Sequence, residues 1–247
     1  MSAKRRDPRL EMQAVRARYN DPHRYELIDV WHRFTAIAIY NEVSSSWPSL
    51  RTQAGHVILN AGAGGNDLGV CPSTTINLDI SEARLLSLPQ PVQASVEALP
   101  FVNASIDTIV CVGSVINYCD AALVIGEFSR ILKPKGCLAL EFESSHSAEL
   151  ITQRAFGRSA AVAETFYAGQ PETIWVYTFS HIRNLLDAAG LTLKRSIPIH
   201  VLSPWAFLLL RSLRAAAIIA RLDRVARNVY PLTRWSSNHL LFCEKDI

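Results

Sequence analysis

The sequence lacks the paired cysteines of a disulfide-stabilised or zinc-binding protein. Its five cysteines lie far apart, are odd in number and form no CxxC pair. They are Cys71, Cys111, Cys119, Cys137 and Cys243. This pattern argues against a disulfide framework and against a zinc site. The histidines show no ligand spacing either, so we predict no metal.

Long apolar runs are also missing. The sequence contains no uncharged apolar stretch of about 18 residues, the length that an ordinary membrane-spanning helix needs. The first residues are basic, but no apolar segment follows them as it would in a secretory signal. We therefore expect a cytoplasmic protein.

Charge of one sign is not in great excess. Lys and Arg total 25 and Asp and Glu total 22, which gives a net charge of +3 and argues against a general nucleic-acid-binding protein. Hydrophobic residues make up 49% of the sequence and charged residues 19%, as in a folded globular protein. The 247 residues suffice for one α/β domain with appended elements.

Short apolar runs alternate with helical patterns along most of the chain. The runs with the length and composition of buried strands are 56–60, 75–79, 106–112 and 137–142, followed by 191–201 and 239–244. Helices are predicted after Ser81, Asp120 and Ser180, each of which can cap a helix. The alternation predicts a doubly wound α/β fold with a parallel sheet.

The N-terminal part is set apart from this pattern. We expect residues 1–50 to form a helical cap, because a helix-compatible segment ends there at a Ser- and Pro-rich break. Residues 51–247 then form the α/β domain, with insertions at about 144–178 and 203–236.

A glycine-rich turn follows the first buried run and reads NAGAGGND over residues 60–67. Glycine lets a ligand approach the backbone closely, although a tight structural turn explains the same residues. Asp79 ends the next run, 17 positions after Gly62, near where an acid binds ribose hydroxyls in dinucleotide-type folds. NAD binding is disfavoured because Asp67 replaces the third glycine of GxGxxG.

Two further segments complete a recognisable order. Residues 95–101 read SVEALPF and precede a run that contains Asp107, and residues 126–142 read GEFSRILKPKGCLALEF. With the glycine turn and Asp79, residues 56–142 resemble the class I S-adenosylmethionine-dependent methyltransferases, in particular the small-molecule type-11 group. The resemblance implies a Rossmann-like, seven-stranded, mostly parallel sheet and methyl transfer from S-adenosylmethionine to a small-molecule acceptor.

The resemblance also implies where the cofactor binds. The glycine turn would face its methionine part, Asp79 would hold its ribose, and the residues after the fourth strand would border its reactive methyl group. The implied cofactor-binding residues are Asn60, Ala61, Gly62, Gly64, Asp79, Ile80, Ser95, Val96, Val112, Gly113 and Ser114.

Two positions depart from the family. Asn60 stands where an acid is usual and Asn66 where glycine is usual, and residues 67–72 are too short and broken for the long helix that normally follows the turn. Asn60 loses the charge attraction for the cofactor's ammonium group. A non-catalytic accessory protein that binds S-adenosylmethionine is therefore an alternative.

The acceptor side of the site is less specific in sequence. Asn117 and Tyr118 follow the fourth run and are placed to orient an acceptor, although Tyr118 equally suits a packed aromatic. Glu143, on the same strand face as Glu141, suits a general base or a solvated carboxylate. We predict Tyr118 and Glu143 as catalytic, in a crevice roofed by the cap through Tyr19 and by the 144–178 insertion.

Residues 205–234 combine arginines with apolar residues. A basic amphipathic helix of this kind lies on an anionic membrane, packs on its own core, or meets a second subunit in a homodimer. The first interpretation favours an amphipathic or lipid-like acceptor and a membrane-associated protein. It also leaves a peripheral membrane module on a Rossmann-like scaffold as a second alternative function.

Overall fold

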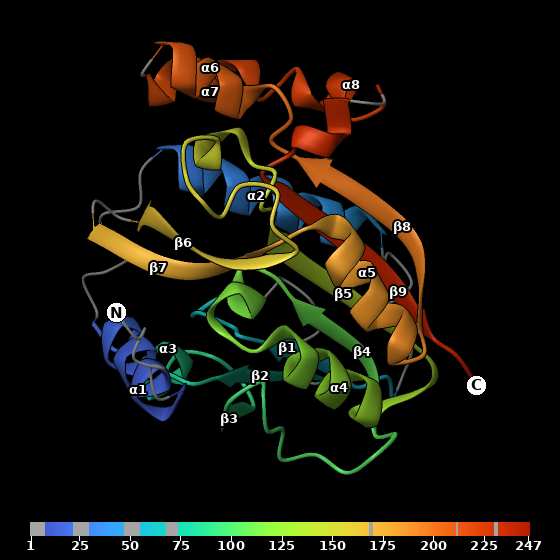
Figure 1. The fold of residues 1–247 in the computed structure, drawn as a ribbon. Helices are drawn as coiled ribbons and strands as arrows, with labels where there is room; N and C mark the ends of the chain where they lie inside the picture. Colours follow the sequence, from blue (N-terminus) through green and yellow to red (C-terminus); the bar gives the residue numbers. More distant parts are fainter. Residues whose placement is uncertain are drawn as a thin grey trace, which may run out of the picture.

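The computed structural model describes residues 8–21, 30–46, 55–67, 74–167, 170–210, 212–229 and 232–247. A seven-stranded sheet lies at the centre in the order β3-β2-β1-β4-β5-β9-β8 (Figure 1). Only β9 runs antiparallel to its neighbours, β5 and β8. The predicted Rossmann-like, mostly parallel sheet is confirmed.

The elements have the following bounds. The sheet consists of β1 (Ile58–Ala61), β2 (Thr75–Asp79), β3 (Pro91–Gln93), β4 (Ile106–Cys111), β5 (Leu132–Glu143), β8 (Leu191–Ile199) and β9 (Asn238–Lys245). A separate hairpin pairs β6 (Ala160–Tyr167) with β7 (Gln170–Tyr177). The helices are α1 (Pro8–Tyr19), α2 (Val30–Ser46), α3 (Glu82–Leu85), α4 (Ala121–Ile131), α5 (Phe179–Ala188), α6 (Ser203–Leu210), α7 (Leu213–Ile219) and α8 (Asp223–Ala226), with 3₁₀ turns η3 (Val115–Tyr118), η4 (Ala148–Leu150) and η5 (Leu232–Trp235).

Helices cover both faces of the sheet, which explains why its central strands are mostly buried and rich in apolar residues. On one face α4 and α5 pack Phe128 and Leu186 against Ile109 and other strand residues. On the other face α2 packs Ile39 against Val110 and its neighbours. Successive residues of β4 thus enter opposite layers, as the alternation of a strand requires.

The two segments that carry the family resemblance hold one another in place. Arg130 on α4 donates to the carbonyl oxygens of Leu99 and Phe101 at 3.0 and 2.7 Å. Glu127 pairs with Arg130 and accepts from the Leu99 amide at 2.7 Å. The LPF segment is therefore clamped to α4, which gives these motif residues a structural role.

Several local expectations need correction. The helix after Ser81 is only α3, and the Ser81 hydroxyl donates to Tyr19 and Asn20 of the cap instead of capping it. Thr178 caps α5 in place of Ser180, because its side chain accepts from the His181 amide. Most of the stretch predicted to break after the glycine turn, residues 68–73, lies outside the described residues.

The N-terminal helix α1 and the helices α6, α7 and α8 lie outside the sheet at different ends of the molecule (Figure 1). The N-terminal α1 joins α3, because Arg84 donates to the Tyr19 carbonyl at 2.9 Å. The short helices α6, α7 and α8 lie at the end of the molecule far from β3 (Figure 1). Among the helices that the structure describes, none has the length and apolar character needed to cross a membrane.

Candidate active site

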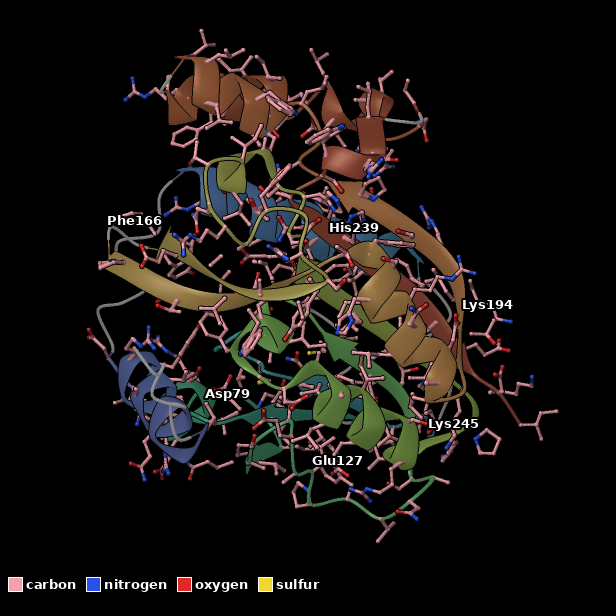
Figure 2. All side chains as sticks on the ribbon, viewed as in Figure 1. Asp79, Glu127, Phe166, Lys194, His239 and Lys245 are labelled. Carbon is pink, nitrogen blue, oxygen red and sulfur yellow. The ribbon has the colours of Figure 1, made fainter. Side chains whose placement is uncertain are left out.

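A cavity of about 1230 Å³ opens at the carboxyl ends of β1, β2, β4 and β5. Parallel α/β sheets bind ligands at this edge, where the loops after neighbouring strands meet. Figure 2 shows Asp79 at the end of β2 and Phe166 on the β6–β7 hairpin, and both residues line the cavity. The cavity thus extends from the sheet to the inserted hairpin.

The glycine turn forms one wall of this cavity. Gly62 has φ of +76°, and a Cβ at this position would collide with both methyl groups of Val115. Glycine is therefore required for the backbone conformation and for the packing. Gly62 and Gly64 line the cavity, whereas Asn60 and Ala61 lie buried behind it.

The side chain of Asn60 connects the glycine turn to β2 by hydrogen bonds. Its side-chain nitrogen donates to the Asn66 carbonyl at 2.6 Å and to Asn77 Oδ1 at 2.9 Å. Asn77 in turn donates to the Pro89 carbonyl at 2.8 Å. The asparagine that replaces the usual acid is thus a neutral bridge between β1, the turn and β2.

Asp79 lies beside the glycine turn, and each of its carboxylate oxygens accepts one backbone hydrogen bond. Oδ2 accepts from the Gly64 amide and Oδ1 from the Ser81 amide, both at 2.8 Å. Burial raises the pKa of Asp79, and these two amides oppose the rise. A carboxylate offers about four acceptor positions, so each oxygen retains capacity for a ribose hydroxyl.

The remaining residues implied for the cofactor meet in the same cavity. They are Ile80, Ser95, Val96, Val112, Gly113 and Ser114. Gly113 and Ser114 both have positive φ, of +86° and +59°, directly after β4. This left-handed turn directs the Ser114 amide at Glu141 Oε2, 2.5 Å away. An adenine, a ribose and a sulfonium-bearing chain find apolar, acidic and backbone partners here, so the residues present fit S-adenosylmethionine.

Two carboxylates from β5 lie farther along the cavity. Glu141 is fully buried and accepts from Asn238 Nδ2 at 2.6 Å as well as from Ser114. Burial raises the pKa of Glu141. Burial raises the pKa of Glu143 to about 7, and the charges of Glu141 and Glu149 act in the same direction. Glu143 can therefore exchange a proton near neutral pH.

The two residues of η3 differ in what they offer an acceptor. Tyr118 lines the cavity, donates its hydroxyl to Glu172 Oε2 at 2.5 Å and packs edge-on against Tyr19 of the cap. Asn117 is fully buried, and its amide group bonds to the backbone of Glu143 and Trp175. The expectation that Asn117 orients an acceptor is thus wrong, because its side chain fixes η3 to β5 and β7.

Other segments complete the wall beyond Tyr118. Besides Tyr19, the lining residues from the cap, the hairpin and α6 include Ile37, Tyr40, Tyr167, Ile174, Phe207 and Leu208. Tyr40, Ser237 and Asn238 were missed from the sequence, since they come from ends of the chain whose place in space no local motif reveals. For Asn238 the sequence offers one clue, which is that this residue directly precedes the last predicted strand. In the structure Asn238 pairs with Glu143 across β5 and β9.

Metal ligands do not gather in the described parts of the chain, where no group of three His, Cys, Asp or Glu side chains is arranged for an ion. His146 packs its ring against Phe156 at 6.0 Å and is not among the residues that line the cavity. Glu143 and Tyr118, the two residues predicted as catalytic, both line the cavity.

Comparison with known proteins agrees with this geometry. The model of a methyltransferase domain family matches residues 59–140. No curated protein matches the sequence. Among solved structures, geranyl diphosphate C-methyltransferase from Streptomyces coelicolor, crystallised with S-adenosyl-L-homocysteine, is 11% identical with a TM-score of 0.59, and the match covers 95% of this chain and 98% of that one.

Two other structures show what the fold accommodates. A Burkholderia thailandensis 1,6-didemethyltoxoflavin-N1-methyltransferase is 13% identical over 100% of this chain and 94% of that one, with a TM-score of 0.55. The [4+2]-cyclase SpnF is 14% identical over 86% and 81% of the two chains, with a TM-score of 0.54. The fold is thus shared with a cyclase as well as with methyltransferases, so the fold alone does not decide the activity. Residues 59–140 match a methyltransferase domain, and they lie within a fold that the chain shares with solved S-adenosylmethionine-dependent methyltransferases.

Proposed function

We propose that this enzyme methylates a small amphipathic molecule held beyond Tyr118 and Glu143. The observation that carries the proposal is the extent of the cavity, which continues from the cofactor residues to Phe207 and Leu208 on α6. Pockets for one drug-sized ligand measure about 300–1,000 Å³. The cavity volume of about 1230 Å³ therefore leaves space for an acceptor next to the cofactor.

The lining of the acceptor part supports a molecule with an apolar body and a polar reactive end. Apolar side chains come from α2, η4, β7 and α6, namely Ile37, Leu150, Ile174, Val176, Phe207 and Leu208. Polar side chains line the same cavity, among them Tyr40, Glu143 and Asn238 as well as Glu149, Gln153 and Glu164. An acceptor would thus place its nucleophile beside Glu143 and its apolar part toward α6.

S-adenosylmethionine, when bound, supplies an electrophilic methyl group on a positively charged sulfur. The turn at Gly62 and the carboxylate of Asp79 hold the cofactor on one side of the cavity. Gly113 and Ser114 separate this side from the acceptor. Catalysis rests mainly on fixing the two reactants in line, because the donor is already reactive.

Glu143 accepts the proton that the acceptor's nucleophilic atom loses when it attacks the methyl group. Its pKa of about 7 suits this role, since a base works best with a pKa near the working pH. Glu141 acts as a positioning residue, because its two oxygens fix Ser114 and Asn238 at the border of the two ligand positions.

The experiment is a transfer assay with methyl-labelled S-adenosylmethionine and a panel of amphipathic amines, phenols and hydroxy compounds. Glu143→Gln should lower kcat by about 100-fold or more, the usual contribution of a general base. The matched control is Glu164→Gln, which removes an exposed carboxylate from the same cavity. The role of Glu143 is refuted if both variants turn over an accepted substrate at the wild-type rate.

A further inference from the structure

The segment from Leu213 to Val229 has an inward and an outward side. It consists of α7 and α8 and the turns after them. The amide of Ala220 donates to the Ala216 carbonyl, and the amide of Ala226 donates to the Leu222 carbonyl. The inward side is buried and consists of Ala216, Ala220, Asp223 and Ala226. Within α7 and α8 a position two residues after a buried one lies about 200° around the helix, so Ile218 and Val225 point away from the protein. Leu222 and Val229 lie just after the two helices.

Large apolar residues occupy this outward side, where polar residues are normal. Ile218, Leu222, Val225 and Val229 are 65%, 58%, 69% and 47% exposed, and Leu209 and Leu210 on the adjacent α6 are 80% and 57% exposed. We call these six residues the outer face. Proteins rarely leave such a group uncovered unless it serves an interaction.

Uncompensated positive charge accompanies the outer face. Arg214, Arg221 and Arg224 are exposed, and none of the three forms an ion pair in the described parts of the chain. The acid nearest in sequence, Asp223, is turned inward and accepts from the Leu202 amide at 2.7 Å and the Ser203 hydroxyl at 2.5 Å. The charge of Arg227 is compensated, since it pairs with Glu42.

We propose that the outer face docks this enzyme on an anionic membrane surface. Apolar side chains flanked by unpaired arginines match the apolar boundary and negative headgroups of such a membrane. A second copy fits less well, because a twofold contact through this face would bring arginines toward arginines.

The docked face connects directly to the acceptor part of the cavity. Phe207 and Leu208 line that cavity from α6, and the next two residues, Leu209 and Leu210, belong to the outer face. Docking therefore places the α6 wall of the cavity at the bilayer, where amphipathic molecules concentrate. This consequence rests on the proposed function, whereas the docking itself does not.

The test is co-sedimentation with vesicles of phosphatidylcholine containing phosphatidylglycerol, and with phosphatidylcholine alone. Binding should need the anionic lipid and should weaken as salt rises, because exposed charges are screened. Replacing Arg214, Arg221 and Arg224 by Gln should lower the partition coefficient about 100-fold, from about 1 kcal/mol per arginine. Replacing Ile218, Leu222 and Val225 by Ser should remove the binding that persists at high salt.

The control variant removes the same charge elsewhere. Lys135, Arg183 and Lys194 are exposed cations on β5, α5 and β8, outside the outer face, and their change to Gln should leave vesicle binding unchanged. Binding of S-adenosylhomocysteine verifies that every variant is folded and tests the cofactor site separately. Equal sedimentation of the wild type and both outer-face variants overturns the proposal. So does a concentration-dependent dimer that only the outer-face variants abolish, without any vesicle binding by the wild type.

Discussion

Replacing Glu143 by Gln is expected to stabilise the protein at alkaline pH and to leave its stability at acidic pH nearly unchanged. The free energy of unfolding depends on pH wherever the folded and unfolded states bind different numbers of protons. Folding raises the pKa of Glu143 from 4.5 to about 7. Below the lower value Glu143 is protonated in both states, so glutamine, a neutral side chain of similar shape, changes little.

The sign and size follow from this shift. As pH rises from 4.5 to about 7 the unfolded chain releases the proton first, so the wild type loses stability over this window. At 1.36 kcal/mol per pKa unit, the loss is at most about 3 kcal/mol, and less where cavity water solvates the half-buried carboxylate. Above pH 7 the difference between wild type and variant stays constant.

Urea denaturation at pH 4.5 and at pH 8 measures the effect as a difference between the two proteins, which cancels the titration of all other groups. Glu164→Gln serves as the control, because this carboxylate is exposed in the same cavity and should show no such difference. A Glu143→Gln effect that is the same at both pH values would refute a raised pKa at this position.

Three further predictions concern the two sides of the cavity. Asp79→Ala should raise the Kd for S-adenosylhomocysteine about 10- to 100-fold in calorimetry, because the ribose loses a charged acceptor worth about 1.5–3 kcal/mol; an unchanged Kd would remove Asp79 from the site. Gly62→Ala should destabilise the protein more than Gly55→Ala in urea denaturation, since both glycines have positive φ but only Gly62 lacks room for a Cβ. Tyr118→Phe should cost about 1–3 kcal/mol of stability by removing the donor to buried Glu172, and should leave the Kd for S-adenosylhomocysteine unchanged.

The sheet, and the meeting of the glycine turn and Asp79 in one cavity, were accessible from the sequence because their signals are local. Strands buried on both faces, such as β4, appear as short runs rich in apolar residues, and the turn after β1 carries its own glycines. The segment around Arg130 was recognised as a motif, and the structure gives its physical reason in the clamp on Leu99 and Phe101.

The acceptor side was less accessible because long-range pairing decides it. Asn238 reaches Glu141 only through the antiparallel register of β9, which no local pattern encodes. Asn117 follows β4, where an acceptor-binding residue is expected, but its side chain bonds to the backbone of Glu143 and Trp175 instead. Residues 205–234 had a helical pattern, yet turns divide it into short helices that pack through small residues such as Ala216.

A crystal structure with S-adenosylhomocysteine tests the central claim most directly. The account predicts density at the glycine turn, with the ribose hydroxyls on the Asp79 carboxylate. It also predicts that the sulfur lies near Gly113, facing the part of the cavity that Tyr118 and Glu143 line. A ligand bound away from Asp79, or one whose sulfur faces away from Glu143, would contradict the account.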